Sequence, residues 1–261
     1  MKPTIVFFDI DGTIWDERQR IPDSTVEALK LLKENGHHAF LNSGRTRAFI
    51  RERDIKPLTI DGIVAGCGTF VEIDHDIKKN VIMDEALVAK TVALLKKRHM
   101  PQVLEGCDYL YLDEEDFEGD PFLDILKNNF GAELSPLTGS ENNRRINKLS
   151  VDLVDERIEE TLGRLAEDFH IILHGAEFME LVPTGNTKAT GMQFVADYYG
   201  IPMENTFAFG DSRNDLEMLE AAGTGVVMGN GTKEAKETGD YVTKHLKEDG
   251  IYHALEHFGL I

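Results

Sequence analysis

The sequence predicts an α/β fold with a Rossmann-like parallel sheet as its core and a second, α+β domain inserted into it. Short apolar runs alternate with helical patterns over the first part of the chain, and the same alternation returns in the last third. Such alternation favours parallel strands joined by right-handed crossovers. The middle of the chain instead carries short strand-like segments. We therefore expect a core of residues 1–82 and 183–261 and an inserted domain of residues 83–182.

The elements of the core follow from apolar periodicity and turn residues. Strands are expected at 5–8, 38–41, 62–65, 206–209 and 225–228. Helices are expected at 24–35, 46–53, 187–199 and 214–222, with a further helical stretch at the C-terminus. Asp23 or Ser24 is available to cap the first helix, and Gly36 is a stop signal behind it.

The inserted domain has shorter elements. Helices are expected at 84–98, 122–129 and 157–168. Strands are expected at 102–104, 109–112, 148–153, 171–173 and 178–182. The basic cluster Arg144, Arg145 and Lys148 is interpreted as a solvated face, the usual place of a charge run, or else as a contact for a second negative group on a substrate.

The composition favours a protein that acts on small molecules. The chain has 261 residues, with 28 Lys and Arg against 47 Asp and Glu, and a formal net charge of -19. Nucleic acids and anionic membranes attract clusters of Lys and Arg, so we expect neither as a partner. We expect a monomer or a small homo-oligomer.

The cysteines and the amino terminus indicate the compartment. Cys67 and Cys107 lack metal-type spacing and favour reduced thiols, although two cysteines alone leave a disulfide open. The amino terminus does not combine a basic region with a long apolar stretch. We therefore expect a cytoplasmic protein.

Two carboxylates end the first apolar run. Asp9 and Asp11 follow Ile5-Val6-Phe7-Phe8, at the carboxyl end of a predicted strand, where open α/β sheets place their chemistry. Carboxylates this close repel each other unless a cation lies between them or one of them holds a proton. Mg²⁺ is the natural candidate because it prefers oxygen ligands and pairs with phosphate.

Two further strand ends and one helix start complete the predicted site. Asn42-Ser43-Gly44-Arg45 and Gly210-Asp211-Ser212-Arg213-Asn214-Asp215 follow predicted strands, and Lys188 lies near the start of a helix. Asp9, Asp11 and Asp211 offer oxygen ligands to Mg²⁺. Ser43, the Gly44 amide and Asn214 donate hydrogen bonds to an anion, and Lys188 adds a mobile positive charge that reaches phosphate oxygens from the other side. A cation and donors around one anionic group indicate phosphoryl transfer.

Each segment alone has a simpler interpretation. Asp-x-Asp-Gly is more often a turn or part of a calcium loop, but Thr13 stands where that loop needs an acidic ligand. Residues 42–45 alone are an ordinary loop, Lys188 alone an exposed helix lysine, and 210–215 alone a helix cap. Their joint order, each after the right element, favours the functional interpretation. Trp15 is interpreted as a packing residue close enough to border the entrance of the site.

These segments carry a family resemblance. Phe8-Asp9-Ile10-Asp11-Gly12-Thr13, Asn42-Ser43-Gly44-Arg45, Lys188 and the segment 210–215 resemble the four ordered motifs of the haloacid dehalogenase (HAD) superfamily. The large insert, Glu180-Leu181-Val182-Pro183 before Lys188, and Val227-Met228-Gly229-Asn230 are similar to the Cof-type phosphatases, which have a C2 (IIB-like) cap domain.

The resemblance implies a role for each matching residue. Asp9 would be the nucleophile that forms an aspartyl-phosphate, and Asp11 the general acid and base. Magnesium would be held by the carboxylates of Asp9 and Asp211 and the backbone carbonyl of Asp11, with Asp215 orienting the site. Phosphate would be bound by Ile10, through its amide, and by Ser43, Gly44, Lys188 and Asn214. Arg45 would face phosphate or substrate, or pair with the acidic surface.

The predicted function is magnesium-dependent hydrolysis of a small phosphomonoester, a sugar phosphate or a related metabolite, through an aspartyl-phosphate. The substrate class rests on the family resemblance alone. One alternative is a phosphotransferase or phosphomutase of the same fold, in which the phosphoryl group passes to another hydroxyl. The other is a non-catalytic sensor of a phosphorylated metabolite. The presence of Asp9, Asp11, Lys188 and Asp211 counts against a sensor, which does not need both a nucleophile and a general acid and base.

Overall fold

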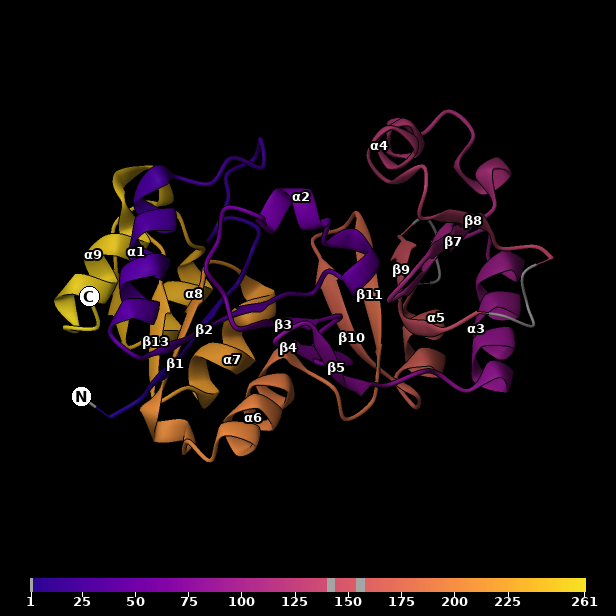
Figure 1. Cartoon of the computed structure of the whole chain (residues 1–261). Helices are drawn as coiled ribbons and strands as arrows, with labels where there is room; N and C mark the ends of the chain where they lie inside the picture. Colours follow the sequence, from indigo (N-terminus) through magenta and orange to yellow (C-terminus); the bar gives the residue numbers. More distant parts are fainter. Residues whose placement is uncertain (1, 140–143, 154–157) are drawn as a thin grey trace. The chain divides into compact units, whose positions relative to one another are not determined.

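The structure is a computed structural model that describes residues 2–139, 144–153 and 158–261. The chain divides into two compact units (Figure 1). Unit 1 contains Met1–Gly44, Arg51–Lys79 and Thr187–Ile261, and unit 2 contains Arg45–Ile50 and Asn80–Asn186. The predicted insert 83–182 lies within unit 2. The domain bounds given above stay a prediction, and the grouping of residues 45–50 with unit 2 was not expected.

Unit 1 is built on an eight-stranded sheet of order β14-β13-β12-β1-β2-β3-β4-β5. Its strands are β1 (Ile5–Phe8), β2 (His38–Asn42), β3 (Gly62–Ala65), β4 (Phe70–Ile73), β5 (Asp76–Asn80), β12 (Thr206–Gly210), β13 (Thr224–Val227) and β14 (Tyr241–Val242). All pairs from β14 to β3 are parallel, and β4 runs antiparallel to β3. The predicted parallel α/β core is confirmed.

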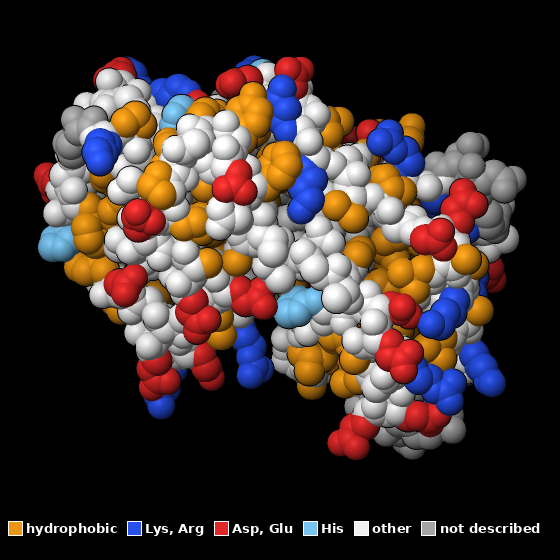
Figure 2. Space-filling view, turned by 90° about the horizontal axis from the view of Figure 1, so that it is seen from below, with side chains coloured by type: hydrophobic (Ala, Val, Ile, Leu, Met, Phe, Trp, Pro, Cys, Tyr) orange, Lys and Arg blue, Asp and Glu red, His pale blue; other side chains and the backbone are white. Residues whose placement is uncertain are grey.

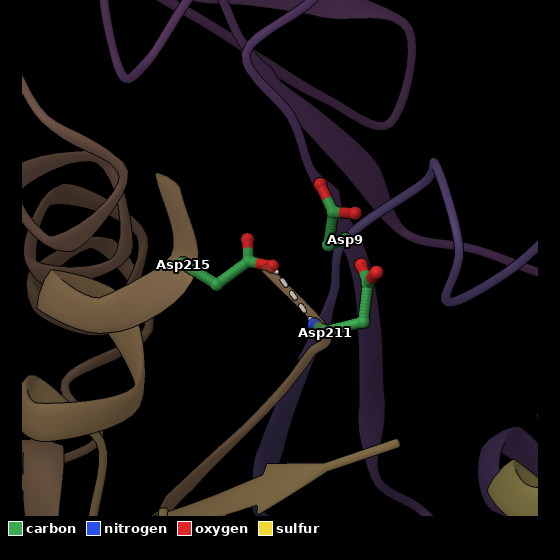
Figure 3. Close-up of side chains that lie close together, drawn as sticks. All are labelled: Asp9, Asp211 and Asp215. Carbon is green, nitrogen blue, oxygen red and sulfur yellow. Dashed lines mark hydrogen bonds between the residues drawn. The ribbon is translucent and has the colours of Figure 1, made fainter. Parts of the chain in front are cut away.

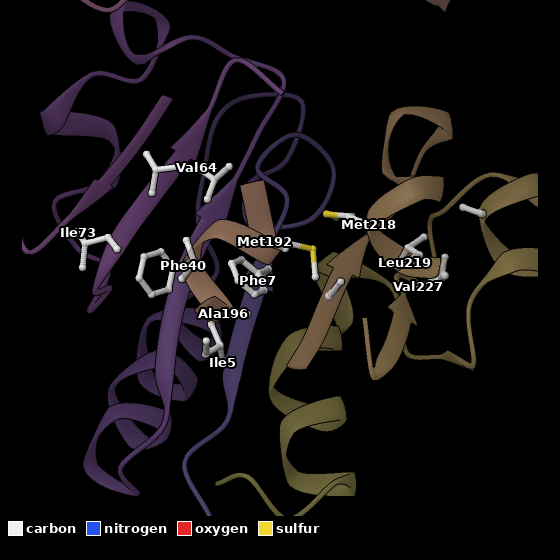
Figure 4. Packing of buried hydrophobic residues seen from close by; sticks show 14 residues of the cluster. Ile5, Phe7, Phe40, Val64, Ile73, Met192, Ala196, Met218, Leu219 and Val227 are labelled. Carbon is white, nitrogen blue, oxygen red and sulfur yellow. The ribbon is translucent and has the colours of Figure 1, made fainter. Parts of the chain in front are cut away.

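Helices accompany this sheet along the chain of unit 1. They are α1 (Asp23–Glu34), α2 (Glu52–Ile55), α6 (Lys188–Tyr199), α7 (Leu216–Ala221), α8 (Lys233–Thr238) and α9 (Gly250–His257). Strand β1 is buried at every position, which explains why it is a continuous apolar run rather than an alternating one. Phe7 packs on Phe40 of β2 and on the α6 side chains Met192 and Ala196, within the cluster drawn in Figure 4. This packing fixes the central strands and α6, and therefore the residues at their ends.

Unit 2 has a six-stranded sheet of order β10-β11-β9-β6-β7-β8. Its strands are β6 (Gln102–Gly106), β7 (Leu110–Leu112), β8 (Leu134–Pro136), β9 (Ile146–Asp152), β10 (Phe169–His174) and β11 (Phe178–Pro183). Its helices are α3 (Glu85–Lys97), α4 (Pro121–Phe130) and α5 (Ile158–Leu165). The pairs are antiparallel except β7 with β8, so the predicted α+β character is confirmed. Residue 157, the expected first residue of α5, lies outside the described residues.

Two local predictions are wrong. The helix expected over 46–53 is instead a 3-10 turn at Arg47–Phe49 followed by α2, because Ile50 and Arg51 are extended. The Arg47 guanidinium donates to the Ile50 carbonyl at 2.6 Å, which stabilises this break. Helix α1 is not capped by Asp23 or Ser24: Pro22 occupies the cap position.

Four strands were not predicted, namely β4, β5, β8 and β14. Three of them are short or largely polar, so period-2 alternation is weak in them. Among the residues that the structure describes, none of the helices has the length and apolar character needed to cross a bilayer.

Residues 45–50 belong to unit 2 through side-chain contacts. Ala48 and Phe49 pack in an apolar cluster with Val103 and Leu110, and the Phe49 and Phe130 rings meet edge to face at 5.0 Å. The Thr46 hydroxyl donates to Glu105 at 3.1 Å. The segment that directly follows Ser43 and Gly44 is thus fixed by the inserted unit.

Candidate active site

Three neighbouring strand ends bring the predicted site together. Strand β1 lies between β12 and β2, parallel to both, so the residues that follow these strands share one edge of the sheet. The Asp9 amide donates to the Phe209 carbonyl at 2.9 Å, and the Ser43 amide to the Val64 carbonyl at 2.9 Å. Backbone bonding therefore continues one residue past β1 and β2 and fixes the direction in which Asp9 and Ser43 leave the sheet. Figure 3 shows the carboxylates of Asp9 and Asp211 close together.

Lys188 enters the same site from α6. Thr187 caps this helix, and a reciprocal capping box with Thr190 fixes its first turn. The Asn42 side chain donates to the Lys188 carbonyl at 3.2 Å and so attaches the helix start to β2. The Lys188 ammonium donates to Asp9 Oδ1 and to Asp215 Oδ1, each at 2.6 Å. The lysine is 2% exposed, so it is neither a solvated nor a mobile charge.

Asp215 organises the loop after β12. Its Oδ2 accepts from the amides of Asp211 at 2.9 Å and Ser212 at 3.0 Å, while its Oδ1 accepts from Lys188. Figure 3 shows the bond to the Asp211 amide as a dashed line. Both oxygens of this buried carboxylate are occupied by donors of the protein itself. Asp215 is thus suited to orient its neighbours.

The carboxylates shift each other's ionisation. Burial raises the pKa of Asp9 well above its ordinary value, Asp215 adds to this, and Lys188 opposes it. Burial, and then Asp215, raise the pKa of Asp211 to about 7. Burial lowers the pKa of the Lys188 ammonium, but Asp215 and Asp9 outweigh it, and the net shift is upward. The site therefore holds more negative charge than Lys188 alone balances.

This charge excess fits a divalent cation. Asp9, Asp211 and Asp215 each offer an oxygen, and these oxygens lie within 4.8 Å of one another. Oxygen donors in such a cluster suit a hard cation such as Mg²⁺. Among the described residues, the cluster includes Asp215 and not the Asp11 carboxylate. Because both oxygens of Asp215 already accept hydrogen bonds from the protein, we regard Asp9 and Asp211 as the carboxylates that remain suited to the ion.

The Asp11 carboxylate is held by a residue whose role the sequence did not reveal. The Trp15 indole N–H donates to Asp11 Oδ1 at 3.0 Å, although Trp15 had been interpreted as a packing residue. Asn230 was also missed: its amide donates to the Gly12 carbonyl at 2.7 Å and its oxygen accepts from the Leu246 amide. The sequence offered only two hints of these contacts: Trp15 is close to the first motif, and Asn230 follows the fourth motif.

The remaining predicted residues are placed as follows. Ile10 and Gly44 are buried next to Asp9 and Ser43 in the chain, and Ser43 is itself buried. Asn214 is half-buried, and its side-chain oxygen accepts from the Ser212 hydroxyl at 2.7 Å. Arg45 belongs to unit 2, unlike the rest of the predicted site residues, which lie in unit 1. Cys67 and Cys107 are both buried thiols.

Comparison with known proteins decides the family. A family model described as haloacid dehalogenase-like hydrolase matches residues 6–255, almost the whole chain. The chain belongs to this family. The HAD assignment made from the four motifs, with its Cof-type subfamily, is thereby confirmed.

Individual relatives of this HAD-like hydrolase are phosphatases. The chain is 31% identical to a Bacillus subtilis (strain 168) protein named "Putative phosphatase YkrA", covering 100% of both chains. It is 29% identical to 5-amino-6-(5-phospho-D-ribitylamino)uracil phosphatase YitU of the same organism, covering 99% of both. Among solved structures, the HAD subclass IIB sugar phosphatase BT4131 matches with a TM-score of 0.83 at 27% identity, over 99% of this chain and 100% of that one. The protein is a phosphatase of the HAD family, the enzyme class that the sequence predicts.

Proposed function

We propose that this HAD-like phosphatase uses magnesium to hydrolyse a small phosphomonoester through an aspartyl-phosphate on Asp9. The observation that carries the proposal is the buried Asp9 carboxylate at the end of β1, held by Lys188 at 2.6 Å and close to the Asp211 carboxylate. A carboxylate that a lysine holds at one oxygen can use its other oxygen as the nucleophile.

Asp9 Oδ1 accepts from Lys188, and we assign the attack on phosphorus to the other oxygen, Oδ2. A bond forms between Oδ2 and phosphorus as the bond from phosphorus to the ester oxygen breaks. Asp11 gives its proton to the departing oxygen and later takes one from the water that attacks phosphorus. That second attack breaks the bond between phosphorus and Oδ2, which restores Asp9 and releases inorganic phosphate.

The magnesium ion would be held by the carboxylates of Asp9 and Asp211 and by the backbone carbonyl of Asp11. Asp215 would orient Asp211 by accepting a hydrogen bond from the Asp211 backbone amide. When bound, Mg²⁺ would neutralise the negative charge on the phosphoryl oxygens. We assign phosphate binding to the amides of Ile10 and Gly44, the Ser43 hydroxyl, the Asn214 amide group and Lys188. Arg45 is assigned to phosphate or to the substrate.

The substrate proposed is a sugar phosphate or a related metabolite. The relative YitU acts on a phospho-D-ribitylamino compound, and BT4131 is a sugar phosphatase. Both names describe a phosphate ester on a polyhydroxylated carbon chain. The specificity of this chain is inferred from that shared chemistry.

The proposed partner is therefore a small phosphorylated molecule. We also propose that the protein acts in the cytoplasm, as a monomer or a small homo-oligomer. Figure 2 shows Lys and Arg side chains scattered among Asp and Glu on the described part of the face in view, rather than gathered in a basic patch. With a formal net charge of -19, such a surface repels nucleic acids and anionic membranes.

A screen of phosphomonoesters with Mg²⁺ tests the proposal. We expect the wild type to release free phosphate from several sugar phosphates, and Asp9→Asn to lose about 10³-fold or more of this activity. Asp197→Asn, an exposed aspartate of α6, is the matched control and should keep full activity. The proposal is refuted if the wild type hydrolyses none of the esters, or if the Asp9→Asn protein keeps most of the activity. Isomerised sugar phosphate without net phosphate release would instead indicate a phosphomutase.

A further inference from the structure

The chain's single tryptophan lies against the proposed general acid and base. Trp15 is 2% exposed, whereas Asp11 is exposed, and the indole N–H donates to Asp11 Oδ1 at 3.0 Å. A buried ring is held in one position by its surroundings, while an exposed aspartate on a loop samples several rotamers. The hydrogen bond to the fixed ring therefore restricts the rotamers of the Asp11 carboxylate.

The backbone keeps the two side chains in register. The Ile10 carbonyl accepts from the amides of Ile14 at 2.9 Å and Trp15 at 3.1 Å, and the Gly12 amide donates to the Trp15 carbonyl at 3.0 Å. Asp11 and Trp15 also form a β-bridge. This closed turn carries both the donor and the acceptor, so a movement of one side of the turn moves the other.

The chemistry of the indole suits this task. An indole nitrogen is a donor only, so its partner must be an acceptor, and it carries no charge that would compete with Lys188 or the carboxylates. The indole can thus fix the direction of the Asp11 carboxylate without adding a charge to the acidic cluster. Among the described residues, that cluster contains Asp9, Asp211 and Asp215 but not the Asp11 carboxylate. An error of about 1 Å in the position of a reacting group can cost about 10²-fold in rate.

We propose that Trp15 is a positioning residue: its indole N–H holds the Asp11 carboxylate in the orientation in which it exchanges a proton with the leaving group and with water. This inference rests on the proposed role of Asp11. It differs from a packing role, for which the bulk of the ring would suffice and the N–H would be irrelevant.

The test uses the leaving group. An alkyl phosphate needs a proton on its departing oxygen, whereas 4-nitrophenyl phosphate releases a stable phenolate without one. We expect Trp15→Phe, which lacks the donor, to lower kcat/KM for an alkyl phosphate such as glycerol phosphate by about 10- to 100-fold. The value for 4-nitrophenyl phosphate should change less than about threefold, within the ordinary scatter of a substitution that spares the reacting groups.

A matched variant separates the donor from the bulk. In Trp15→His the imidazole occupies the place of the five-membered ring of the indole, with Nε2 where Nε1 lies, so an N–H donor is kept while the same bulk is lost. We expect Trp15→His to retain most of the alkyl phosphate activity that Trp15→Phe loses. Equal losses in the two variants, or equal losses for both esters, would overturn the proposal.

Asp11→Asn distinguishes the two proposals. If Asp11→Asn shows no selective loss on alkyl phosphates, the proposed role of Asp11 fails. If it does show that loss, and Trp15→Phe does not, the positioning role of Trp15 fails alone. Adding Trp15→Phe to Asp11→Asn should cause no further selective loss, because the two changes act through one group.

A spectroscopic measurement leaves Trp15 in place and covers the case in which its variants do not fold. Because the chain has one tryptophan, the Raman band that reports hydrogen bonding of the indole N–H arises from Trp15 alone. We expect this band to shift between the wild type and Asp11→Ala, towards a weaker hydrogen bond in the variant. An unchanged band would show that the indole is not bonded to Asp11, and would refute the proposal.

Discussion

At the scale of single residues, Lys188 decides whether the site can stay folded and charged. Its ammonium forms ion pairs with both Asp9 and Asp215, and all three side chains are buried. Burying an ion is costly, and an ion pair repays the cost only when its geometry is good and its hydrogen bonds are made. Here one cation serves two carboxylates, with Asp211 as a third acid nearby. The site is therefore poised to accept a further positive charge.

Lys188→Met tests this charge balance. Removing one partner of a buried ion pair leaves uncompensated charge, and we expect the metal-free protein to lose about 3–5 kcal/mol of stability. Added Mg²⁺ should raise the melting temperature of the variant more than that of the wild type, because an ion that binds only the folded state stabilises it. Thermal unfolding with EDTA and with Mg²⁺ measures both effects.

The control for this experiment is Lys247→Met. Lys247 pairs with Glu17 at 2.8 Å on the exposed surface of the same unit. Exposed pairs contribute about 0–1 kcal/mol, so its melting temperature should hardly change and should not depend on Mg²⁺ in a new way. A Lys188→Met protein that behaves like this control would contradict the charge argument.

Gly12 is fixed by both its backbone and its neighbour. It has φ +79°, and a Cβ at this position would lie 2.5 Å from Asp211 Oδ2. Gly36 has a similar φ of +85° with nothing within 4 Å of its Cβ position. We expect both Gly→Ala variants to lose about 1–2 kcal/mol of stability from the left-handed backbone. Only Gly12→Ala should lose phosphatase activity, by about 10-fold or more, because it displaces Asp211.

Unfolding curves and steady-state kinetics on the two alanine variants separate strain from displacement. The Gly12 comparison fails if Gly36→Ala loses as much activity as Gly12→Ala. It also fails if Gly12→Ala keeps wild-type kinetics, since Asp211 would then tolerate a shift.

At the scale of elements, the sequence allows the core strands to be predicted because their burial leaves a continuous apolar run. Strand β1 was expected at 5–8 and lies at Ile5–Phe8, and β3 was expected at 62–65 and lies at Gly62–Ala65. The parallel pairing of β1 with β12 places Asp9 and Asp211 at one edge of the sheet, so the proximity of these two residues was also predictable. The precise partners of each side chain were not.

Lys148 shows why side-chain partners escape sequence analysis. It was interpreted as part of a solvated or substrate-facing basic cluster, but it is 1% exposed on β9. Its ammonium bonds to Glu180 of β11 and lies 3.5 Å from Glu105 of β6. Glu105 and Glu180 lie on strands that flank β9 in the sheet but are far from Lys148 in sequence. A local charge pattern cannot indicate such partners, because they depend on strand order and register.

Two elements of unit 2 place like charges near each other. Asp152 ends β9, and Asp120 caps α4. Burial, and then the charge of Asp120, raise the pKa of Asp152 to about 6. A raised carboxyl pKa means that the folded state binds a proton more tightly than the unfolded state, so stability falls as the pH rises from about 4 to 6.

Asp152→Asn should therefore stabilise the protein at neutral pH. The rise in the pKa of Asp152 to about 6 bounds the gain at about 3 kcal/mol, and solvent screening of this half-buried group reduces it to about 1–2 kcal/mol. The gain should be full at pH 8 and should vanish as the pH approaches 4. Melting temperatures of both proteins across this range measure it, and a gain that is independent of pH would argue against the ionisation of Asp152 as its cause.

At the scale of the whole molecule, the division into units cuts through the second motif of the site. Ser43 and Gly44 belong to unit 1, while residues 45–50 belong to unit 2. Unit 2 thus contains residues 45–50 in addition to Asn80–Asn186. The helix expected over 46–53 does not form, because residues 46–50 pack in unit 2 while residues 51–53 belong to unit 1. A local helical pattern cannot reveal this, since the competing contacts come from Val103, Leu110 and Phe130.

The assignment of residues 45–50 predicts which unit loosens when the segment is damaged. Phe49 is half-buried and meets Phe130 edge to face at 5.0 Å in unit 2. Phe207 is also half-buried and meets Phe258 at 5.1 Å in unit 1. Each Phe→Ala change should cost about 2–4 kcal/mol. Local stability is not uniform over a protein, so each loss should concentrate in the unit to which the ring belongs.

Hydrogen exchange of the backbone amides separates the two outcomes. We expect Phe49→Ala to lower the protection of β6 and β7 while β1 and β12 keep theirs, although residue 49 is close in sequence to Ser43. Phe207→Ala should do the reverse. If Phe49→Ala instead lowers the protection of β1 and β12, residues 45–50 stabilise unit 1 rather than unit 2. The Phe207→Ala protein guards against a general loss of protection, because it carries the same chemical change with a ring contact of nearly the same distance.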